Sequence, residues 1–341
     1  MRCLCCGKEI KENAREDERA NEWHRRCIRR FFGTDVLPRI DLSEQELLKL
    51  AEKTVTKGFT VTGVQKKISL HLSEEPDCRM TMVDYPAGYI LKPQTEEYAY
   101  LPEYEDMVMR MANIAGIRTV PHALMKVGES YAYITKRIDR KIEGEHVELY
   151  AMEDFCQLSG RLTEDKYRGS YERCAAVIKK YSDHIGNDLA EFYLRILFSF
   201  ITGNSDMHLK NFSLREENPG RRDFLLSDAY DMLPVNIVLP ADREETALTL
   251  NGKKRNLRRK DFLLLAEHCD LSKKTAEKMI LRLISRADAF RSQIEGSHLP
   301  NDRKEEMIAL MTNRLGRLSS RQISTFLDTP NTSRTSLAAA A

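Results

Sequence analysis

One polar loop between two apolar segments constrains this chain more than any other stretch: residues 203–214, GNSDMHLKNFSL. The preceding residues 192–202 (FYLRILFSFIT) are apolar and predict a buried helix, and residues 212–214 resemble the start of a short strand. Within the loop, Asp206 and Asn211 are separated by four residues. Because polar loops held between buried elements often carry catalytic groups, we expect a functional site here.

The spacing of Asp206 and Asn211 suits phosphoryl transfer. That reaction needs a carboxylate to orient the attacking hydroxyl and oxygen ligands to hold magnesium. Asp206 suits the first role and the Asn211 amide oxygen the second, at the spacing found in the catalytic loop of protein kinases. The alternative is an ordinary turn, because Asn, Asp, Gly and Ser are the commonest turn formers.

Length and composition indicate a substantial core and two domains or lobes, since the chain has 341 residues of which 42% are hydrophobic. The net charge of +2 with 31% charged residues is balanced, so charge alone argues for neither a nucleic-acid nor a membrane partner. No run approaches the roughly 18 apolar residues of a membrane-spanning helix. The N-terminus lacks the apolar region of a secretion signal, so we expect a cytoplasmic protein.

Half of the eight cysteines lie in the first 27 residues. Cys3 and Cys6 form a Cys-x-x-Cys pair, and His24 and Cys27 follow as His-x-x-Cys. Two such pairs suit tetrahedral zinc, and so short a region needs a metal to hold it. We expect a structural rather than a catalytic zinc, because protein ligands fill all four positions. Cys5 is a further thiol in the same stretch, so the sequence does not determine which two cysteines form the first pair. The alternative to a zinc site is a group of free thiols in a loose terminus.

Residues 41–72 predict a helix followed by a strand–turn–strand unit. Ser43 and Glu46 form a capping box at the start of the helix, which should end before Gly58. In residues 58–72 (GFTVTGVQKKISLHL), one glycine and two lysines lie in the turn. Such a turn can lie over nucleotide phosphates, and the alternative is an ordinary hairpin with solvated lysines.

Lys92 is the best candidate for the strand lysine that a kinase site uses to reach the α- and β-phosphates. It lies near the end of a predicted strand at residues 88–93. The following residues, Leu101–Ala115, have helical periodicity with methionines on one face. On that helix, Glu105 either supports Lys92 or faces water. Two more strands are expected at residues 123–127 and 131–135.

The second half of the chain predicts mostly helices. Residues 136–140 fall where a chain would cross from a β-rich lobe into a helical one, and backbone groups at residues 135–138 would then meet an adenine edge.

A short apolar strand from Phe224 ends in aspartates, and both Asp228 and Asp231 qualify as a second magnesium ligand. The order of all these features is that of a protein kinase. The predicted helices span residues 151–159, 170–184, 187–202, 259–269, 272–295 and 302–318.

Three stretches resemble the HipA family of bacterial toxin–antitoxin kinases, and more closely its shorter HipT-like members. Residues 60–70 (TVTGVQKKISL) are similar to the family's phosphate loop, and residues 137–140 (RIDR) to its Arg-Phe-Asp-Arg segment. The most specific match joins residues 203–213 with the AYDML segment at residues 229–233. The resemblance covers roughly residues 55–320. It implies an α+β, two-lobed protein-kinase-like fold of the HipA type, and a Ser/Thr protein kinase that uses ATP and magnesium.

The resemblance also implies roles for individual residues. Asp206 matches the catalytic aspartate, and His208 matches a nearby active-site histidine. Asn211 and Asp231 match the magnesium ligands, which selects Asp231 over Asp228. The residues that it assigns to nucleotide binding are Thr62, Gly63, Val64, Gln65, Lys67, Lys92, Lys136 and Ile138.

Family members autophosphorylate a hydroxyl of the phosphate loop, which Thr60 and Thr62 would supply here in place of the more usual serine. A phosphate would add about −1.5 to −2 charges where the ATP phosphates must bind, and would switch the enzyme off. The implied substrate is an aminoacyl-tRNA synthetase, whose phosphorylation halts translation. The alternatives are a small-molecule kinase of related fold and a catalytically silent, zinc-containing binding protein.

The N-terminal region departs from the family pattern. Full-length HipA carries a β-rich subdomain of about a hundred residues before the phosphate loop, whereas this chain has residues 1–57 there. The HipT-like members take that subdomain from a separate small protein, HipS. The implied partners are therefore a helix-turn-helix antitoxin and a HipS-like protein, with DNA reached only through the antitoxin. Alternatively, the Cys/His module replaces that subdomain in part.

The domain boundaries follow from these assignments. We expect a zinc-binding module at residues 1–33, an N-lobe with the phosphate loop and the nucleotide lysine at residues 34–136, and a helical C-lobe with the catalytic loop at residues 137–325. The low-complexity residues 326–341 should be a disordered tail.

Overall fold

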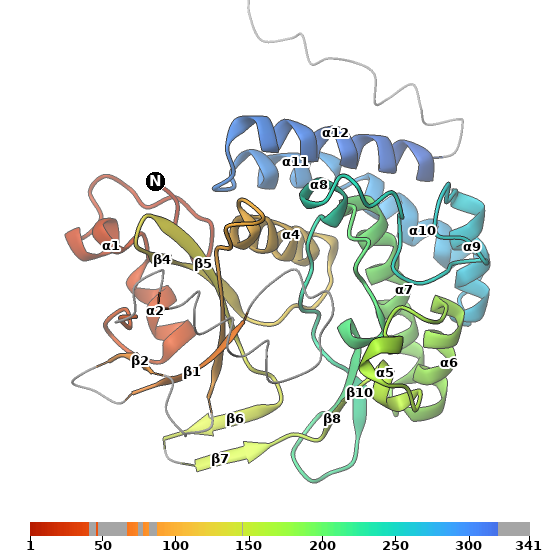
Figure 1. Cartoon of the computed structure of the whole chain (residues 1–341), viewed down its shortest axis with the longest axis horizontal. Coiled ribbons are helices and arrows are strands. Elements are labelled where there is room, and N and C mark those ends of the chain that lie inside the picture. Colours follow the sequence, from red (N-terminus) through yellow and green to blue (C-terminus); the bar gives the residue numbers. More distant parts are fainter. Residues whose placement is uncertain (41–45, 47–66, 74–77, 82–86, 145, 320–341) are drawn as a thin grey trace, which may run out of the picture.

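An antiparallel sheet and a group of helices lie side by side in this protein and form its two lobes (Figure 1). The computed structural model describes residues 1–40, 46, 67–73, 78–81, 87–144 and 146–319. The two-lobed α+β architecture expected from the sequence is confirmed. Among the helices in these ranges, none combines the length and the apolarity that crossing a membrane requires.

The N-lobe sheet has the strand order β2-β1-β3-β5-β4, and each neighbouring pair is antiparallel. The strands predicted at residues 88–93, 123–127 and 131–135 are confirmed, as is the second strand of the 58–72 unit. The helix predicted from Ser43 and the turn at residues 58–66 fall outside the described residues. The five strands are β1 (Ile68–Leu72), β2 (Met80–Thr81), β3 (Tyr89–Pro93), β4 (His122–Val127) and β5 (Ser130–Lys136).

Helix α4 (Leu101–Ala115) packs against β4 and β5, as its predicted apolar face requires. Met107 and Met111 are fully buried on it. Burying a methionine side chain stabilises the fold by about 1.5–3 kcal/mol, so this face explains why the helix forms. The same helix buries Glu105, and a buried carboxylate is costly unless a cation or several hydrogen bonds compensate it.

The N-terminal region contains two short helices, α1 (Glu16–Asn21) and α2 (Arg25–Phe32), which the sequence did not predict. Trp23 is fully buried between them, with its ring 5.5 Å from that of Phe32. The Phe32 ring lies a further 5.5 Å from the ring of Tyr89 on β3. These aromatic contacts join the N-terminal region to the core of the N-lobe sheet (Figure 1).

A small strand lies where the sequence predicted the start of a helix, and a hairpin precedes it. The hairpin β6 (Arg140–Glu143)–β7 (His146–Leu149) leads into β8 (Met152–Asp154), and helix α5 (Phe155–Leu158) starts only afterwards. The prediction of helix from residue 151 is therefore wrong at its start. The reason is that β8 pairs with β9 (Ser213–Glu216), which in turn pairs with β10 (Phe224–Leu226). In addition, Asp154 and Gln157 form a capping box, which fixes the first turn of α5.

The C-lobe helices surround α7 (Ile185–Thr202), which is buried along most of its length. The single helix predicted at residues 272–295 is wrong, because the chain breaks at residues 285–286, where Ser285 Oγ donates a hydrogen bond to the carbonyl of Arg282 at 2.8 Å. The other predicted helices are confirmed to within a few residues. They are α6 (Tyr171–Tyr181), α9 (Arg259–His268) and α12 (Asn301–Leu318), and the split helix is α10 (Lys273–Ile284) with α11 (Ala287–Glu295); a short α8 (Val235–Val238) precedes them.

Candidate active site

Helix α7 leads directly into the polar loop. Gly203 ends the helix with φ 70°, a left-handed conformation that side chains disfavour. A Cβ at this position would also lie 2.5 Å from Leu310 on α12. The loop then passes through the short 3₁₀ helix η2 (Leu209–Asn211) into β9. The sequence therefore correctly predicts a polar loop held between buried elements.

Hydrogen bonds fix Asp206 and Asn211 relative to each other. The Asn211 side-chain amide donates to the carbonyl oxygen of Asp206 at 2.8 Å. Because its NH2 group is used in this bond, the Asn211 amide oxygen is left as an acceptor for a metal ion. The hydroxyl of Tyr167 donates to Asp206 Oδ1 at 2.6 Å, which uses one of the two carboxylate oxygens. The loop thus presents a carboxylate and an amide oxygen, as the sequence suggested.

Burial shifts the pKa values of two ionisable side chains in the loop, Asp206 and His208. It raises the pKa of Asp206 to about 6, although the hydrogen bond from Tyr167 opposes the shift. It also lowers the pKa of His208 to about 4, so this ring is neutral at physiological pH. His208 Nδ1 has no hydrogen-bond partner among the described residues. An ionised Asp206 of raised basicity therefore stands beside a neutral imidazole.

Lys92 is the centre of a buried ion cluster that joins the two lobes. Its ammonium lies 2.7 Å from Glu105 Oε1 on α4 and 2.6 Å from Asp231 Oδ1 beyond β10. Only 8% of the Lys92 side chain is exposed, and Glu105 is fully buried. Burial alone would lower the pKa of Lys92, but the two carboxylates outweigh it and raise that pKa. Of the two alternatives for Glu105, the structure shows the one in which it supports Lys92.

Asp231 has the features of a metal-binding carboxylate. Burial would raise its pKa, but the charge of Lys92 outweighs this and lowers the pKa to about 2. The carboxylate is thus ionised, and 39% of the side chain stays exposed. Its backbone is left-handed, with φ 60°, an uncommon conformation that costs about 1 kcal/mol or more and is frequent at functional sites. The other candidate, Asp228, instead lies 4.0 Å from the Arg118 side chain.

Two side chains of α7 hold the backbone that carries Asp231. The Asp188 carboxylate accepts a hydrogen bond from Leu226 N–H at 2.7 Å, and the Arg195 guanidinium donates one to the Ser227 carbonyl at 2.7 Å. Asp188 and Arg195 are seven residues apart, so they lie on one face of the helix. Sequence reasoning missed both residues, although a single arginine within an apolar helix was a signal that could have found one of them.

The remaining nucleotide-binding predictions fall into two groups. Thr60, Thr62, Gly63, Val64 and Gln65 lie outside the described residues. Lys67, by contrast, is near the ion cluster: burial lowers its pKa, and the charges of Asp231, Lys92 and Lys210 also act on it. The later part of the predicted phosphate loop is therefore close enough to the ion cluster for its charges to act on Lys67.

The segment predicted to hold adenine is already bonded within the protein at several backbone groups. Lys136 N–H donates to the carbonyl of Pro121 at 3.0 Å, and Arg137 N–H donates to Gly88 at 2.9 Å. The carbonyl of Ile138 accepts a hydrogen bond from the Arg215 side chain at 3.2 Å. In addition, the Lys136 ammonium lies 5.7 Å from the centre of the Phe31 ring on α2. Base binding through Lys136 and Ile138 therefore stays a prediction.

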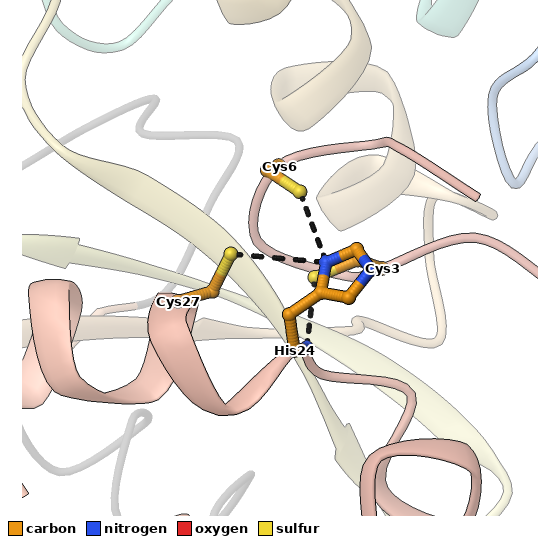
Figure 2. A group of neighbouring side chains, drawn as sticks. All are labelled: Cys3, Cys6, His24 and Cys27. Carbon is orange, nitrogen blue, oxygen red and sulfur yellow. Dashed lines mark hydrogen bonds between the residues drawn. The ribbon is translucent and has the colours of Figure 1, made fainter. Parts of the chain in front are cut away.

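A second candidate site lies at the N-terminus, where the Cys3, Cys6 and Cys27 thiols face the His24 ring (Figure 2). The four potential ligand atoms all lie within 4.8 Å of one another. His24 Nδ1 is 3.4 Å from Cys6 Sγ and 3.9 Å from Cys27 Sγ. The predicted set of four is thus assembled as a possible metal site, and Cys5 is not part of it.

The surroundings of this cluster fit a metal ligand set. His24 Nε2 lies 3.2 Å from the carbonyl of Glu9, a contact that places the proton on Nε2 and leaves Nδ1 as the ligand atom. Gly7, with φ 68°, lets the chain turn back after the first Cys pair, and its N–H donates to the Cys3 carbonyl at 2.8 Å. Such a Cys₃His set has the donor types and the number that tetrahedral zinc requires.

Comparisons with known proteins identify the family to which this chain is similar. The HipA-like C-terminal domain profile matches residues 59–290. A protein of Sinorhizobium fredii named "Putative kinase Y4dM" is 34% identical over 235 residues, which are 63% of this chain and 55% of that protein. A Haemophilus influenzae protein named "Putative kinase" is 25% identical over 307 residues, 83% of this chain and 88% of that protein. The chain thus spans about half of the first relative's length and most of the second's.

Two solved structures share the fold. A chain of the Shewanella oneidensis MR-1 HipA, HipB and operator DNA complex aligns with a TM-score of 0.66 and 20% identity, over 84% of this chain and 72% of that one. The Helicobacter pylori proinflammatory kinase CtkA aligns with a TM-score of 0.52 and 16% identity, over 77% of this chain and 91% of that one.

The profile match includes β1, Lys92, α4, the polar loop and Asp231, which together make up the candidate active site. The resemblance noted in the sequence is therefore confirmed, and the chain belongs to the family defined by the HipA-like C-terminal domain.

Proposed function

We propose that this protein is an ATP-dependent serine/threonine protein kinase that acts as the toxin of a HipA-type toxin–antitoxin system. One observation carries the proposal: the Lys92 ammonium is held by Glu105 from the N-lobe and by Asp231 from the C-lobe, beside the loop of Asp206. A strand lysine fixed by a helix glutamate is what a kinase needs to bind the α- and β-phosphates of ATP. The names of two relatives support kinase activity.

The side chains of the candidate active site suit the steps of phosphoryl transfer. Lys92 would bind the α- and β-phosphates, and Asp206 would accept the proton of the attacking hydroxyl. Because its pKa is raised to about 6, Asp206 is a stronger base than a solvated aspartate yet remains ionised at neutral pH. Asn211 and Asp231 offer oxygen ligands of the kinds that magnesium prefers. Magnesium bound there would neutralise charge on the phosphates.

Autophosphorylation is the second part of the proposal. Thr60 or Thr62 would accept the phosphate, a few residues before Lys67, whose charge interacts with Asp231 and Lys92. A phosphothreonine of about −1.5 to −2 charges near that cluster would compete with the phosphates of ATP. We infer that the modification inactivates the enzyme.

The partners are proposed from the family. The Shewanella structure contains HipB and operator DNA, as its title states. For this chain we propose a helix-turn-helix antitoxin, DNA contact only through that antitoxin, and a separate HipS-like protein. The proposed substrate is an aminoacyl-tRNA synthetase, which places the protein in the cytoplasm.

We also propose that Cys3, Cys6, His24 and Cys27 bind one structural zinc ion. Four ligand atoms of suitable type within 4.8 Å support this assignment. The Trp23 ring contacts Phe32, and the Phe32 ring contacts Tyr89 on β3. These contacts suggest that the metal would stabilise the N-lobe rather than take part in transfer.

Mass spectrometry with labelled ATP tests the proposed activity. Purified protein is incubated with γ-labelled ATP and magnesium, alone and with a set of bacterial aminoacyl-tRNA synthetases. We expect label on a serine or threonine of one synthetase, and on Thr60 or Thr62 of the kinase itself. Asp223→Asn, a surface change at the partner of His184, should behave as the wild type. Label on small molecules alone would contradict protein-kinase activity, and no label from a preparation that binds ATP would contradict kinase activity altogether.

A further inference from the structure

Arg110 joins the N-terminal region to α4, the helix that carries Glu105, and the function described so far gives it no role. Its Nη2 donates a hydrogen bond to the carbonyl oxygen of Leu4 at 3.0 Å. In the sequence, Leu4 lies between Cys3 and Cys6 of the candidate metal cluster, in the turn of residues 3–7. This turn is thus in direct contact with a helix of the candidate active site.

The carbonyl oxygen of Leu4 joins this turn to two elements of the N-lobe at once. Besides the bond from Arg110, it accepts a hydrogen bond from Leu124 N–H on β4 at 3.1 Å. A carbonyl oxygen has two lone pairs, so both bonds can form together. Leu4 is only 1% exposed, and a buried carbonyl that lost its partners would cost free energy. The turn is therefore docked at a defined place on α4 and β4.

The Arg110 guanidinium is held by further contacts with α4 and with the turn. Its Nε donates to Asp106 Oδ2, one helical turn earlier on α4, at 2.7 Å, and the two side chains are 12% and 7% exposed. On the side of the turn, a Cβ at Gly7 would lie 3.0 Å from Arg110 Nη1, so the missing side chain leaves room for the guanidinium. A planar guanidinium can donate to a carboxylate and a carbonyl together, whereas the ammonium of a lysine does not reproduce this fork.

These contacts are close to the ion cluster along the helix. Asp106 directly follows Glu105, whose Oε1 accepts a hydrogen bond from the Lys92 ammonium at 2.7 Å. In protein kinases, the position of the helix that carries this glutamate controls activity. Helix α4 also packs against β4, β5, α7 and α11, so the contact with the turn adds to this packing and does not replace it.

We propose that Arg110 is a positioning residue, which docks the turn of residues 3–7 on α4 and thereby keeps Glu105 against Lys92. This inference rests on the proposed kinase function. Since Lys92 would bind the α- and β-phosphates, loss of the contact weakens the binding of ATP. The transfer step itself is unaffected, because Arg110 acts on the lysine only through the helix.

The test compares Arg110→Lys with Arg173→Lys, which changes an exposed arginine on α6. The new lysine keeps a positive charge beside Asp106 but lacks the fork that also reaches Leu4. Nucleotide titration gives the Kd of ATP, initial rates at saturating ATP give kcat, and thermal melting reports the fold. Because packing still holds α4, we expect Arg110→Lys to raise the Kd of ATP by about 3-fold to 10-fold with kcat within about 2-fold of wild type. Arg173→Lys should change neither constant.

A double variant separates positioning from a general loss of stability. If Arg110 acts through Glu105, adding Arg110→Lys to Glu105→Gln should change the Kd of ATP by less than about 2-fold, because the contact that it supports is already weakened. Two independent effects would instead multiply in the double variant.

Two results would overturn the role of Arg110. One is an affinity for ATP in Arg110→Lys that equals that of the wild type, and the other is full multiplication of the two effects in the double variant. If Arg110→Lys does not fold, Gly7→Ala crowds the guanidinium from the side of the turn and is judged by the same two criteria. A wild-type protein that binds no ATP would contradict the proposed function itself, whereas an ATP-binding enzyme that is insensitive to Arg110 would contradict the positioning role alone.

Discussion

The Cys/His cluster and the candidate active site around Lys92 and Asp231 both contain potential metal ligands, but the chain assembles them in different ways. The cluster draws its four members from residues 3–27, a short stretch in which helix α1 lies between the two pairs. In the candidate active site, Lys92 and Asp231 are 139 positions apart in the sequence. Only the packing of both lobes brings those two side chains to 2.6 Å. A local cluster suits a structural metal, whereas a site built from both lobes can respond to a substrate that binds between them.

The largest effect is expected from Asp231→Asn. This change removes a proposed magnesium ligand and one partner of buried Lys92, so we expect transfer to fall by about 1,000-fold. Asp228→Asn is the matched control, because Asp228 lies on the same segment but contacts Arg118. The comparison is made by initial rates at several magnesium concentrations. Equal losses in both variants would remove the distinction between the two aspartates.

Loss of the proposed zinc should act on stability instead of chemistry. We expect Cys6→Ser with Cys27→Ser to abolish zinc binding and to destabilise the protein by about 3 kcal/mol or more, because metal binding contributes to folding. Cys5→Ser is the control, since Cys5 lies outside the cluster. Elemental analysis measures the zinc and thermal melting measures the stability. The idea fails if the double variant melts at the temperature of the control.

Glu105→Gln should have a smaller effect than Asp231→Asn. It weakens the support of Lys92 without removing a metal ligand, and we expect about a 10-fold fall in kcat/KM. Most of the loss should be in ATP affinity, since Lys92 would bind the phosphates. Nucleotide titration and initial rates on the same preparation separate the change in ATP affinity from the change in kcat. An unchanged affinity for ATP would count against this role of Glu105.

The smallest effect concerns Glu103, two residues before Glu105 on the same helix. Burial raises its pKa from 4.5 to about 7. Since the folded state holds the proton more tightly, the stability contributed by Glu103 is highest below about pH 4.5 and is lost as the pH rises towards 7. Glu103→Gln resembles the protonated form, so it should stabilise the protein by about 1 kcal/mol at pH 8 and hardly at all at pH 5. Denaturant unfolding at both pH values measures this, and an equal gain at both would contradict the assignment.

The parts of the fold that sequence could predict are those whose signal is local. The apolar segment before Gly203, the spacing of Asp206 and Asn211 and the short strand that ends near Lys92 can each be predicted from within a dozen residues. Strand β8 could not, because it pairs with residues 213–215, far along the chain. The same holds for Tyr167, which comes next to Asp206 only through the C-lobe fold.

The other errors concern the break in the helix predicted at residues 272–295 and the helices at the N-terminus. Residues 272–295 have continuous helical periodicity, and a single Ser285 side chain bonded to the backbone accompanies the break. At the N-terminus, the cysteine spacing predicted a metal site but gave no sign that α1 and α2 would form. Helix α2 packs through Phe31 and Phe32, whose partner Tyr89 lies on β3.

The most direct test of the account is the rate of γ-phosphate transfer by wild type and by Asp206→Gln, with the Kd of ATP measured on the same preparations. We expect transfer by the wild type, a loss of about 100-fold to 10,000-fold in the variant, and a Kd of ATP that differs by less than about 3-fold, because Lys92 and the magnesium ligands stay in place. Equal rates in the two proteins would contradict the assignment of Asp206 as the base. They would also contradict the central claim that phosphate is transferred at the site formed by Lys92, Asp206 and Asp231.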